Sequence, residues 1–233
     1  MKSTRPIPME WGMFKTSRDA RMLIGEYVLG NDIPVYIINA LPETIDLQDI
    51  IDRVDKIIPR PFLYEVEAVY VGQFEEFYKM NVNAFFDNGA IYISNAQDNA
   101  DDLLDDLLHE IAHAVEVGFS ADIYADQSIR DEFLGKRKRL YTILATEGYD
   151  VNIADFAELG FSAEFDNFLY TEVGYPELRA LSSGLFPSPY SITSIREYFA
   201  IGFETIFLGS PDDIKLNCPS VFRKISFLYN NYK

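Results

Sequence analysis

Residues 98–119, DNADDLLDDLLHEIAHAVEVGF, carry the longest periodic pattern in the chain. Leu104, Leu108, Ile111 and Val115 recur at intervals of three and four residues, which is the spacing of one buried helical face. Ionisable side chains follow the same spacing on another face. The pattern predicts a long amphipathic helix with an apolar face and a second face that carries acidic and histidine side chains in register.

The chain has only two histidines, and His109 and His113 lie four residues apart in this helix. One helical turn places both imidazoles on one face about 6 Å apart, the spacing that two ligands of one zinc ion need. Glu110 emerges beside them, where it can meet a metal-bound water. Two histidines placed at random would fall four apart in roughly 1 of 100 cases, so chance is a weak explanation. The alternative to a zinc site is a pair of surface or capped core histidines.

Two imidazoles do not complete a catalytic zinc site, which takes three protein ligands and one water. Cys218, the single cysteine, lies in a turn-like Asn-Cys-Pro segment, so we expect the third ligand to be a carboxylate. Glu197 is the preferred residue because it begins the strongest downstream helix pattern. Glu116 and Glu147 are rivals, although Glu116 lies only three residues after His113 and would crowd the site.

Glu197 also allows a second interpretation. Ser194 and Glu197 have the spacing of a capping box, in which a glutamate at the third helical position bonds back to the backbone at the helix start. The physical chemistry of these residues leaves the roles of metal ligand and capping residue equally open.

The first hundred residues alternate between strand-like and helix-like patterns. Apolar β-branched and aromatic runs predict strands within residues 33–41, 62–72, 77–89 and 90–94. The Asp87-Asn88-Gly89 sequence predicts a hairpin turn before the last of these strands. A helix is expected over residues 44–57, ended by Pro59 and Pro61, and an amphipathic helix over residues 17–28, closed by Gly30 and Asn31. These segments indicate a small mixed sheet with at least one helix.

Beyond the histidine motif the chain is predicted to be mainly helical. Helices are expected over residues 129–148, within 191–211 and over 219–232. The first of these contains the one basic cluster, Gly135-Lys136-Arg137-Lys138-Arg139, which we expect to pair with acidic neighbours.

No internal repeat or clear linker divides the chain. We therefore expect residues 1–233 to form a single α+β domain with two lobes. A sheet-containing lobe is expected over residues 1–100 and a helical lobe over 101–233, with an aromatic-rich insert at about 120–189.

The composition is that of a globular protein, with 48% hydrophobic and 24% charged residues. A formal net charge of -17 makes the chain a poor candidate for binding nucleic acid or an anionic membrane. The N-terminus lacks the continuous apolar run of a secretory signal, and no apolar stretch approaches the ~18–20 residues of a spanning helix. We expect a protein of the cytoplasm or of a larger particle such as a virion.

The motif residues together resemble a known family. His109-Glu110-Ile111-Ala112-His113 is followed by Tyr190 and then by Glu197-Tyr198-Phe199-Ala200, with the tyrosine seven residues before the glutamate. This arrangement resembles the catalytic domain of the anthrax lethal factor family of zinc metallopeptidases, which belongs to the gluzincins. The resemblance covers roughly residues 85–233. It implies a zincin-like metallopeptidase fold.

The resemblance also implies roles for individual residues. His109, His113 and Glu197 would bind zinc (Zn2+), and Glu110 would act as general base and then as proton shuttle. Tyr190 would donate a hydrogen bond to the oxyanion that develops in the transition state. The alternative for Tyr190, one of 15 tyrosines, is a packing role.

Two further positions bear on the resemblance. Four residues after the third ligand the family carries an acidic residue that orients a zinc-binding imidazole, whereas this chain has Ile201. Glu204, about two turns beyond Glu197 on the same face, could take over this role. In zincins an edge strand just before the HExxH helix pairs with the extended substrate, and residues 89–94 are placed to do this, although they could equally form an inner strand.

The expected function is therefore a zinc-dependent metalloendopeptidase that acts on polypeptides by metal-activated water, without a covalent intermediate. The net charge of -17 suggests basic or neutral peptides as substrates. The alternative is a weakly active or inactive metallopeptidase-like protein with a structural or interaction role, for example in a larger assembly with a protein partner. In that case residues 120–189 would supply an interaction surface or a lid.

Overall fold

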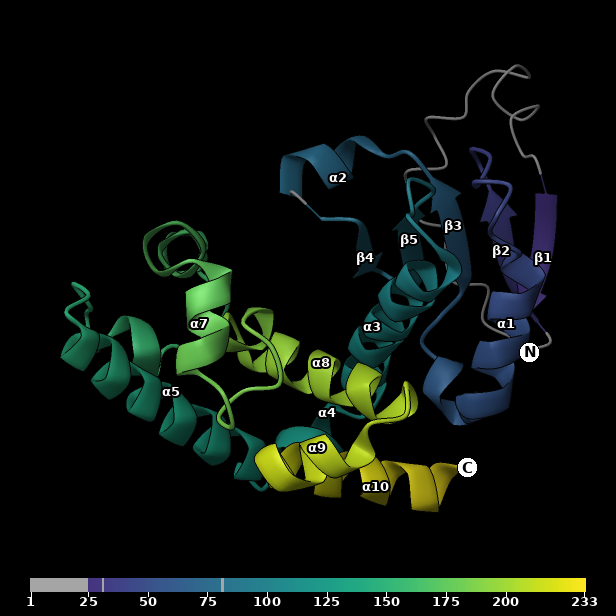
Figure 1. Cartoon of the computed structure of the whole chain (residues 1–233). Helices are drawn as coiled ribbons and strands as arrows, with labels where there is room; N and C mark the ends of the chain where they lie inside the picture. Colours follow the sequence, from purple (N-terminus) through teal and green to yellow (C-terminus); the bar gives the residue numbers. More distant parts are fainter. Residues whose placement is uncertain (1–24, 31, 81) are drawn as a thin grey trace.

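The computed structural model describes residues 25–30, 32–80 and 82–233. Within these residues a mixed five-stranded sheet is followed by a mostly helical part (Figure 1). The strands are β1 (Gly25–Leu29), β2 (Ile33–Ile37), β3 (Ala68–Gly72), β4 (Ala84–Asp87) and β5 (Ala90–Ser94). The architecture is thus α+β, as the sequence predicted.

Two helices lie in the sheet-containing part, and three more, the first of which carries the histidine motif, precede residue 150. These are α1 (Leu47–Ile57), α2 (Glu75–Met80), α3 (Ala100–Gly118), α4 (Ser120–Tyr124) and α5 (Ser128–Glu147). The remaining helices are α6 (Ala163–Asn167), α7 (Tyr175–Leu181), α8 (Ile195–Phe207), α9 (Pro211–Asn217) and α10 (Pro219–Tyr232). Short helical turns are η3 (Arg60–Leu63), η4 (Asp155–Ala157), η5 (Phe168–Val173) and η6 (Tyr190–Ile192).

The strand order is β1-β2-β3-β5-β4, with a parallel centre and antiparallel outer pairs. Val35, Val69 and Ile91 lie side by side in this register and are buried. Alternate strand residues point to opposite faces, and α1 and α3 cover the face that carries these apolar side chains (Figure 1). Hydrophobic burial against the two helices therefore sets which face of the sheet is the core face.

The opposite face carries an aromatic row, defined by Tyr36, Tyr70, Tyr92 and Phe85. These residues are register partners across β2, β3, β5 and β4. Their rings stack in sequence, with centroid distances of 5.3, 5.3 and 4.6 Å. Phe74 and Phe77 pack edge-on against the β4 end of the row, so stacked and edge-to-face contacts link the outer strand to the centre of the sheet.

Several local predictions are confirmed and others are wrong. The hairpin turn at Asn88 and Gly89 is present, with φ of 47° and 86° at these residues. Residues 62–72 are a strand only from Ala68, because Phe62 and Leu63 form a buried turn. The start of the predicted strand 77–89 belongs to α2.

The predicted helix over 17–28 is also corrected. Its last residues, from Gly25, form β1, which pairs with β2 instead of continuing a helix. Residues 17–24 and Asn31 lie outside the described part of the chain.

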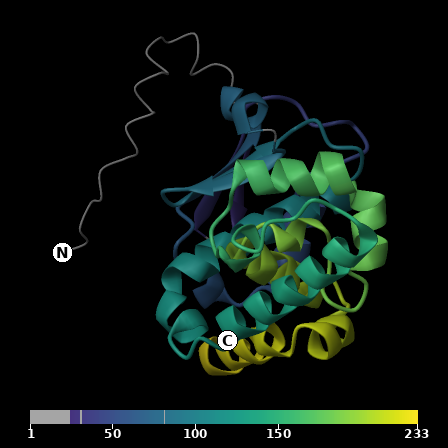
Figure 2. The same cartoon turned by 90° about the vertical axis from the view of Figure 1, so that its left-hand side faces the viewer.

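Helix α3 connects the two parts of the molecule. It packs on the sheet on one side and against α8 on the other, and one cluster of buried apolar side chains runs through both parts. Figure 2 shows α7 above α5 and the C-terminal helices below it. Among the described residues, no helix combines the length and the apolar composition that a membrane crossing requires.

The basic cluster on α5 differs from the prediction. Lys136 and Arg137 are buried and donate hydrogen bonds to main-chain carbonyls, whereas we expected pairing with acidic side chains. Of the four basic residues in the cluster, Lys138 and Arg139 are exposed.

Candidate metal centre

The first half of the site is a single helix. Asn99 caps α3 by accepting hydrogen bonds from the backbone amides of Asp101 and Asp102. The negative charges of these two residues interact favourably with the positive end of the helix dipole. Two turns later, His109 and His113 lie one turn apart with ring centroids separated by 5.0 Å. The helical periodicity alone therefore brings both imidazoles to one face.

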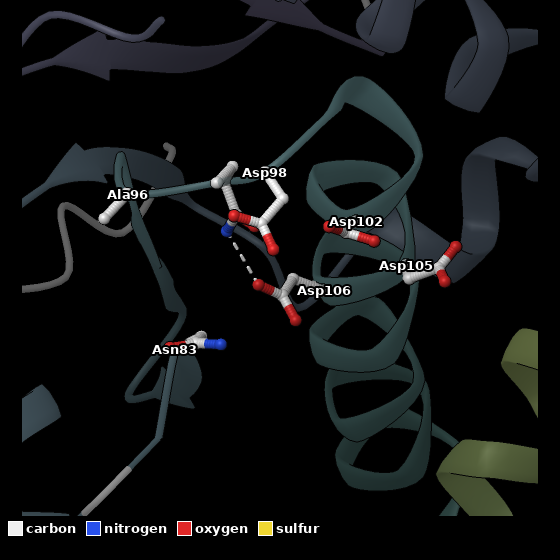
Figure 3. A pocket seen from close by; sticks show the side chains of 7 residues that line it. Asn83, Ala96, Asp98, Asp102, Asp105 and Asp106 are labelled. Atoms are coloured by element: carbon white, nitrogen blue, oxygen red, sulfur yellow. Dashed lines mark hydrogen bonds between the residues drawn. The ribbon is translucent and has the colours of Figure 1, made fainter.

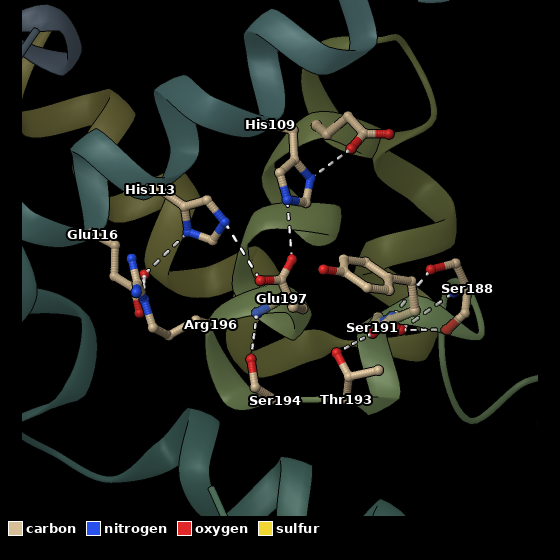
Figure 4. A network of polar contacts seen from close by, with 11 residues as sticks. His109, His113, Glu116, Ser188, Ser191, Thr193, Ser194, Arg196 and Glu197 are labelled. Atoms are coloured by element: carbon tan, nitrogen blue, oxygen red, sulfur yellow. Dashed lines mark hydrogen bonds and ion pairs between the residues drawn. The ribbon is translucent and has the colours of Figure 1, made fainter. Parts of the chain in front are cut away.

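The second half comes from α8. Ser194 accepts a hydrogen bond from the amide of Glu197 and begins this helix. The Glu197 side chain points at the histidines (Figure 4), with Oε2 at 3.0 Å from His109 Nε2 and Oε1 at 3.6 Å from His113 Nε2. One ligand atom from each of the three residues lies within 4.8 Å of the others. Ser194 thus caps the helix, while the carboxylate of Glu197 turns to the histidines.

Two further carboxylates hold the outer nitrogens of the imidazoles. His109 Nδ1 lies 3.2 Å from Glu204 Oε2, and His113 Nδ1 lies 3.4 Å from Glu116 Oε2. This arrangement fixes both rings with Nε2 directed to the common centre, as is usual for metal-binding histidines. Glu204 therefore makes the contact with an imidazole that Ile201 cannot make.

Glu116 is held more firmly than Glu204. It accepts hydrogen bonds from Tyr124 Oη at 2.6 Å and from Arg196 Nε at 2.8 Å (Figure 4 shows Arg196). Because Arg196 precedes Glu197 on α8, this contact also joins the two halves of the site. Glu116 lies on the outer side of His113, so it does not crowd the centre.

The site has a strongly negative field. Burial opposes the charged form of His109, but hydrogen bonds with Glu197 and Glu204 overcome this and raise its pKa to about 10. Burial would raise the pKa of Glu197, but the hydrogen bond with His109 and the charge of His113 hold it below its usual value. A cation is thus strongly favoured between these groups, and a divalent metal ion at the inward-facing nitrogens would meet the same demand.

Glu110 and Tyr190 face a hollow beside this centre. The hollow has a volume of about 320 Å³ and is also bordered by Val82, Asn83, Ala84, Asp105, Asp106, His109, Ile201 and Glu204. Glu110 is only 5% exposed, and burial raises the pKa of its carboxyl group. The ring of Tyr190 lies 6.5 Å from that of His109, and burial raises the pKa of its phenol, which stays protonated at neutral pH. An acid–base group and a hydrogen-bond donor therefore border one space.

The sequence left open whether residues 89–94 form an edge strand or an inner strand, and the structure decides between the two. β5 pairs with β3 on one side and β4 on the other, so residues 89–94 are an inner strand. β4 ends the strand order in the described part of the sheet, and Ala84 borders the hollow. The hairpin places the antiparallel β4, and not β5, next to the site.

An acidic hollow continues from the first. It has a volume of about 270 Å³ and shares Asn83, Asp105 and Asp106 with it. Figure 3 shows Asp98, Asp102 and Asp106 around the space between α3 and the segment that precedes it. Among its described lining residues no lysine or arginine occurs, so the cleft leads away from the candidate metal centre along a negatively charged wall.

The structure thus brings together all five residues singled out in the sequence, His109, Glu110, His113, Tyr190 and Glu197. Glu147 lies exposed at the end of α5 and outside the group. Sequence reasoning missed Arg196 and Tyr124, and it treated Glu116 only as a rival ligand. The position of Arg196 directly before Glu197 was the available signal.

Comparisons of this chain with protein-family models, with curated proteins and with solved structures find no match.

Proposed function

We propose that this chain is a zinc-dependent metalloendopeptidase with a zincin-like fold of gluzincin type. The observation that carries the proposal is the convergence of His109, His113 and Glu197 beside a buried glutamate, Glu110, that faces an open cleft. Two imidazoles and one carboxylate are the ligand set of a catalytic zinc site. The resemblance of the motif residues to the lethal factor family supports the same function.

The donor set fits zinc on its chemistry. The outer nitrogens of both rings face carboxylates, so their inner nitrogens are free to bind a metal ion. When bound, zinc would polarise the substrate carbonyl and lower the pKa of water.

The chain's own residues would complete the reaction. Glu110 accepts a proton from the attacking water and passes it to the leaving amine, a role that suits a carboxyl group whose pKa is raised by burial. Tyr190 donates a hydrogen bond to the carbonyl oxygen as negative charge develops there. The outer edge of β4, where no further strand of the described residues pairs, would bind an extended peptide and hold its backbone along the cleft.

The test of this proposal is a Glu110→Gln variant. It should keep zinc, since Glu110 is outside the ligand set, but its peptide turnover should fall by roughly 10²–10⁴-fold because the proton acceptor is lost. Zinc content and cleavage of a peptide library would be measured together. Glu147→Gln changes an exposed residue that borders neither hollow, so it is the matched control and should behave as wild type.

Zinc binding and peptide cleavage, measured together, separate the peptidase from the structural or interaction role. Zinc binding with cleavage that is lost in Glu110→Gln supports the peptidase. Zinc binding without any cleavage would instead favour the structural or interaction role. Equal turnover in the variant and wild type would rule out Glu110 as the base.

We also propose that the substrates are basic or neutral peptides. Asp105, Asp106 and Glu204 border the hollow beside Glu110, and Asp98 and Asp102 border its continuation. Peptides with lysine, norleucine or glutamate at each position would measure the preference. Cleavage of the glutamate series as fast as the lysine series would refute it.

A further inference from the structure

Arg137 on α5 is completely buried and holds two distant segments of backbone. Its Nε and Nη2 donate to the carbonyls of Ile192 and Thr193, each at 2.9 Å. Its Nη1 donates to the carbonyls of Asp155 and Glu158. A guanidinium group has five N–H donors in a rigid fork, so nearly all of them are used on main-chain oxygen atoms.

The guanidinium is also enclosed by aromatic rings. Its central carbon lies 4.8 Å from the ring centroid of Phe133 and 4.5 Å from that of Phe165. Burial lowers the pKa of Arg137 to about 10, so the group remains charged at neutral pH. A buried charge without its hydrogen bonds is costly, and the four carbonyls must therefore stay close to it.

Two of these carbonyls belong to the segment that carries the site residues. Tyr190 begins the turn η6, and the amide and hydroxyl of Thr193 both donate to the Tyr190 carbonyl. Ser194 follows at once and caps α8, which carries Glu197. The backbone between Tyr190 and the start of α8 is thus tied, through Arg137, to the segment 155–158.

We infer that Arg137 is a positioning residue, which fixes the turn 190–194 and thereby places the Tyr190 phenol over the reaction centre. This inference rests on the proposed function for its catalytic consequence. It also gives the insert 120–189 a specific role, because both α5 and the segment 155–158 belong to it.

Lys136 is the natural comparison because it is the neighbouring buried cation. It donates to the carbonyls of Leu185 and Asn217 and contacts Cys218 Sγ. Its contacts therefore lie mainly at the junction of α9 and α10 and include none of the carbonyls of 190–194. Loss of Lys136 removes a buried charge from the same helix without releasing that turn.

The experiment compares Arg137→Lys with Lys136→Met, each alone and combined with Tyr190→Phe. A lysine keeps the charge but loses the fork, so Arg137→Lys should reduce kcat by about 10- to 100-fold with little change in KM. Added to Tyr190→Phe, it should cause little further loss, because the phenol it positions is already absent. Lys136→Met should reduce stability. Any loss of kcat that it causes should be independent of Tyr190→Phe, so the fold losses of the two changes should multiply in the double variant.

Two measurements do not depend on turnover. Amide exchange of residues 190–194 should be about 10-fold faster in Arg137→Lys and unchanged in Lys136→Met, after correction for global stability. Zinc affinity, measured by chelator competition, should stay close to wild type in both variants, because the packing of α8 against α3 holds Glu197 in place even when the turn is released. If Arg137→Lys does not fold, Thr193→Val, which removes the hydroxyl bond to the Tyr190 carbonyl, should give a smaller shift in the same direction.

The outcomes separate the inference from the function on which it rests. Equal exchange in the two variants, or multiplicative effects of Arg137→Lys and Tyr190→Phe on kcat, would overturn the positioning role. A wild-type chain that binds no zinc and cuts no peptide would overturn the proposed function, and the exchange result would still decide whether Arg137 fixes the turn.

Discussion

Helix α3 brings His109, Glu110 and His113 to the cleft through its own periodicity, whereas Tyr190 and Glu197 reach it through contacts with residues far away in the chain. The formation of one capped helix is enough to place the three α3 residues at the cleft. The 190–197 segment is held by Arg137, by the carbonyl of Leu159 that accepts from the Ile195 amide, and by α3 itself.

The difference shows where a site of this type tolerates change. The α3 half depends on helix formation and burial, which many apolar substitutions of similar volume preserve. The α8 half depends on particular hydrogen bonds to main-chain atoms, which few substitutions can replace. Variants on the two sides should therefore fail in different ways.

The largest effect is expected for Glu197→Gln. A glutamine keeps the shape of the side chain and the hydrogen bond from the backbone N–H of residue 197 to Ser194 Oγ, but it removes the charged ligand of the α8 half. Elemental analysis should give about one zinc per wild-type chain and far less in the variant, with the far-UV circular dichroism of both unchanged. A variant that retains full zinc would show that the two α3 histidines bind the metal without α8.

A smaller effect is expected for the carboxylates behind the imidazoles. Glu116→Gln and Glu204→Gln should each weaken zinc binding by ~10- to 100-fold. Glu116→Gln should be the more severe, because Glu116 also binds Tyr124 and Arg196 and is less exposed than Glu204. Chelator competition measures both affinities, and a larger loss in Glu204→Gln would reverse this ranking of the two supports.

The smallest effect is a change of stability with pH at Asp105 on α3. Burial and then the charge of Glu204 raise the pKa of this carboxyl from 3.8 to about 6. Because the folded state holds the proton more tightly than the unfolded state, the charged form costs stability as pH rises from about 4 to about 6. Asp105→Asn should therefore raise Tm at pH 7.5 by about 1–2 °C.

Thermal unfolding of Asp105→Asn and wild type between pH 4 and pH 8 checks this sign. The two Tm values should converge toward pH 4, where the wild-type carboxyl is protonated. Asp101→Asn, which removes an exposed carboxylate from the first turn of the same helix, is the control and should show no such stabilising trend.

Local patterns in the sequence predicted much of the site. The apolar repeat and the two histidines of α3, the hairpin turn at Asn88-Gly89 and the helix that carries Glu197 each arise from neighbouring residues. The edge position of β4 could not be predicted in this way, because it results from the parallel pairing of β3 with β5, residues 68–72 with 90–94.

The role of Arg137 was missed for a related reason. Its charge suggested pairing with acidic neighbours. However, Phe133, Arg137, Leu140 and Leu144 follow the same helical spacing as the buried face of α3, and all four are completely buried. The spacing was therefore a signal that the side chain faces inward. The carbonyls that it binds lie 18 to 56 residues further along the chain, so no local pattern identifies them.

The aromatic row, on the face of the sheet opposite α1 and α3, gives this protein an optical reporter. Stacked tyrosine rings at 5.3 Å couple their ultraviolet transitions, and the row runs across β2, β3 and β5 to Phe85 on β4. A slip of one residue in any of these strand pairs would turn a ring to the opposite face and break the stack. The near-ultraviolet circular dichroism of the tyrosines should therefore record whether a refolded or mutated chain has its strands in register.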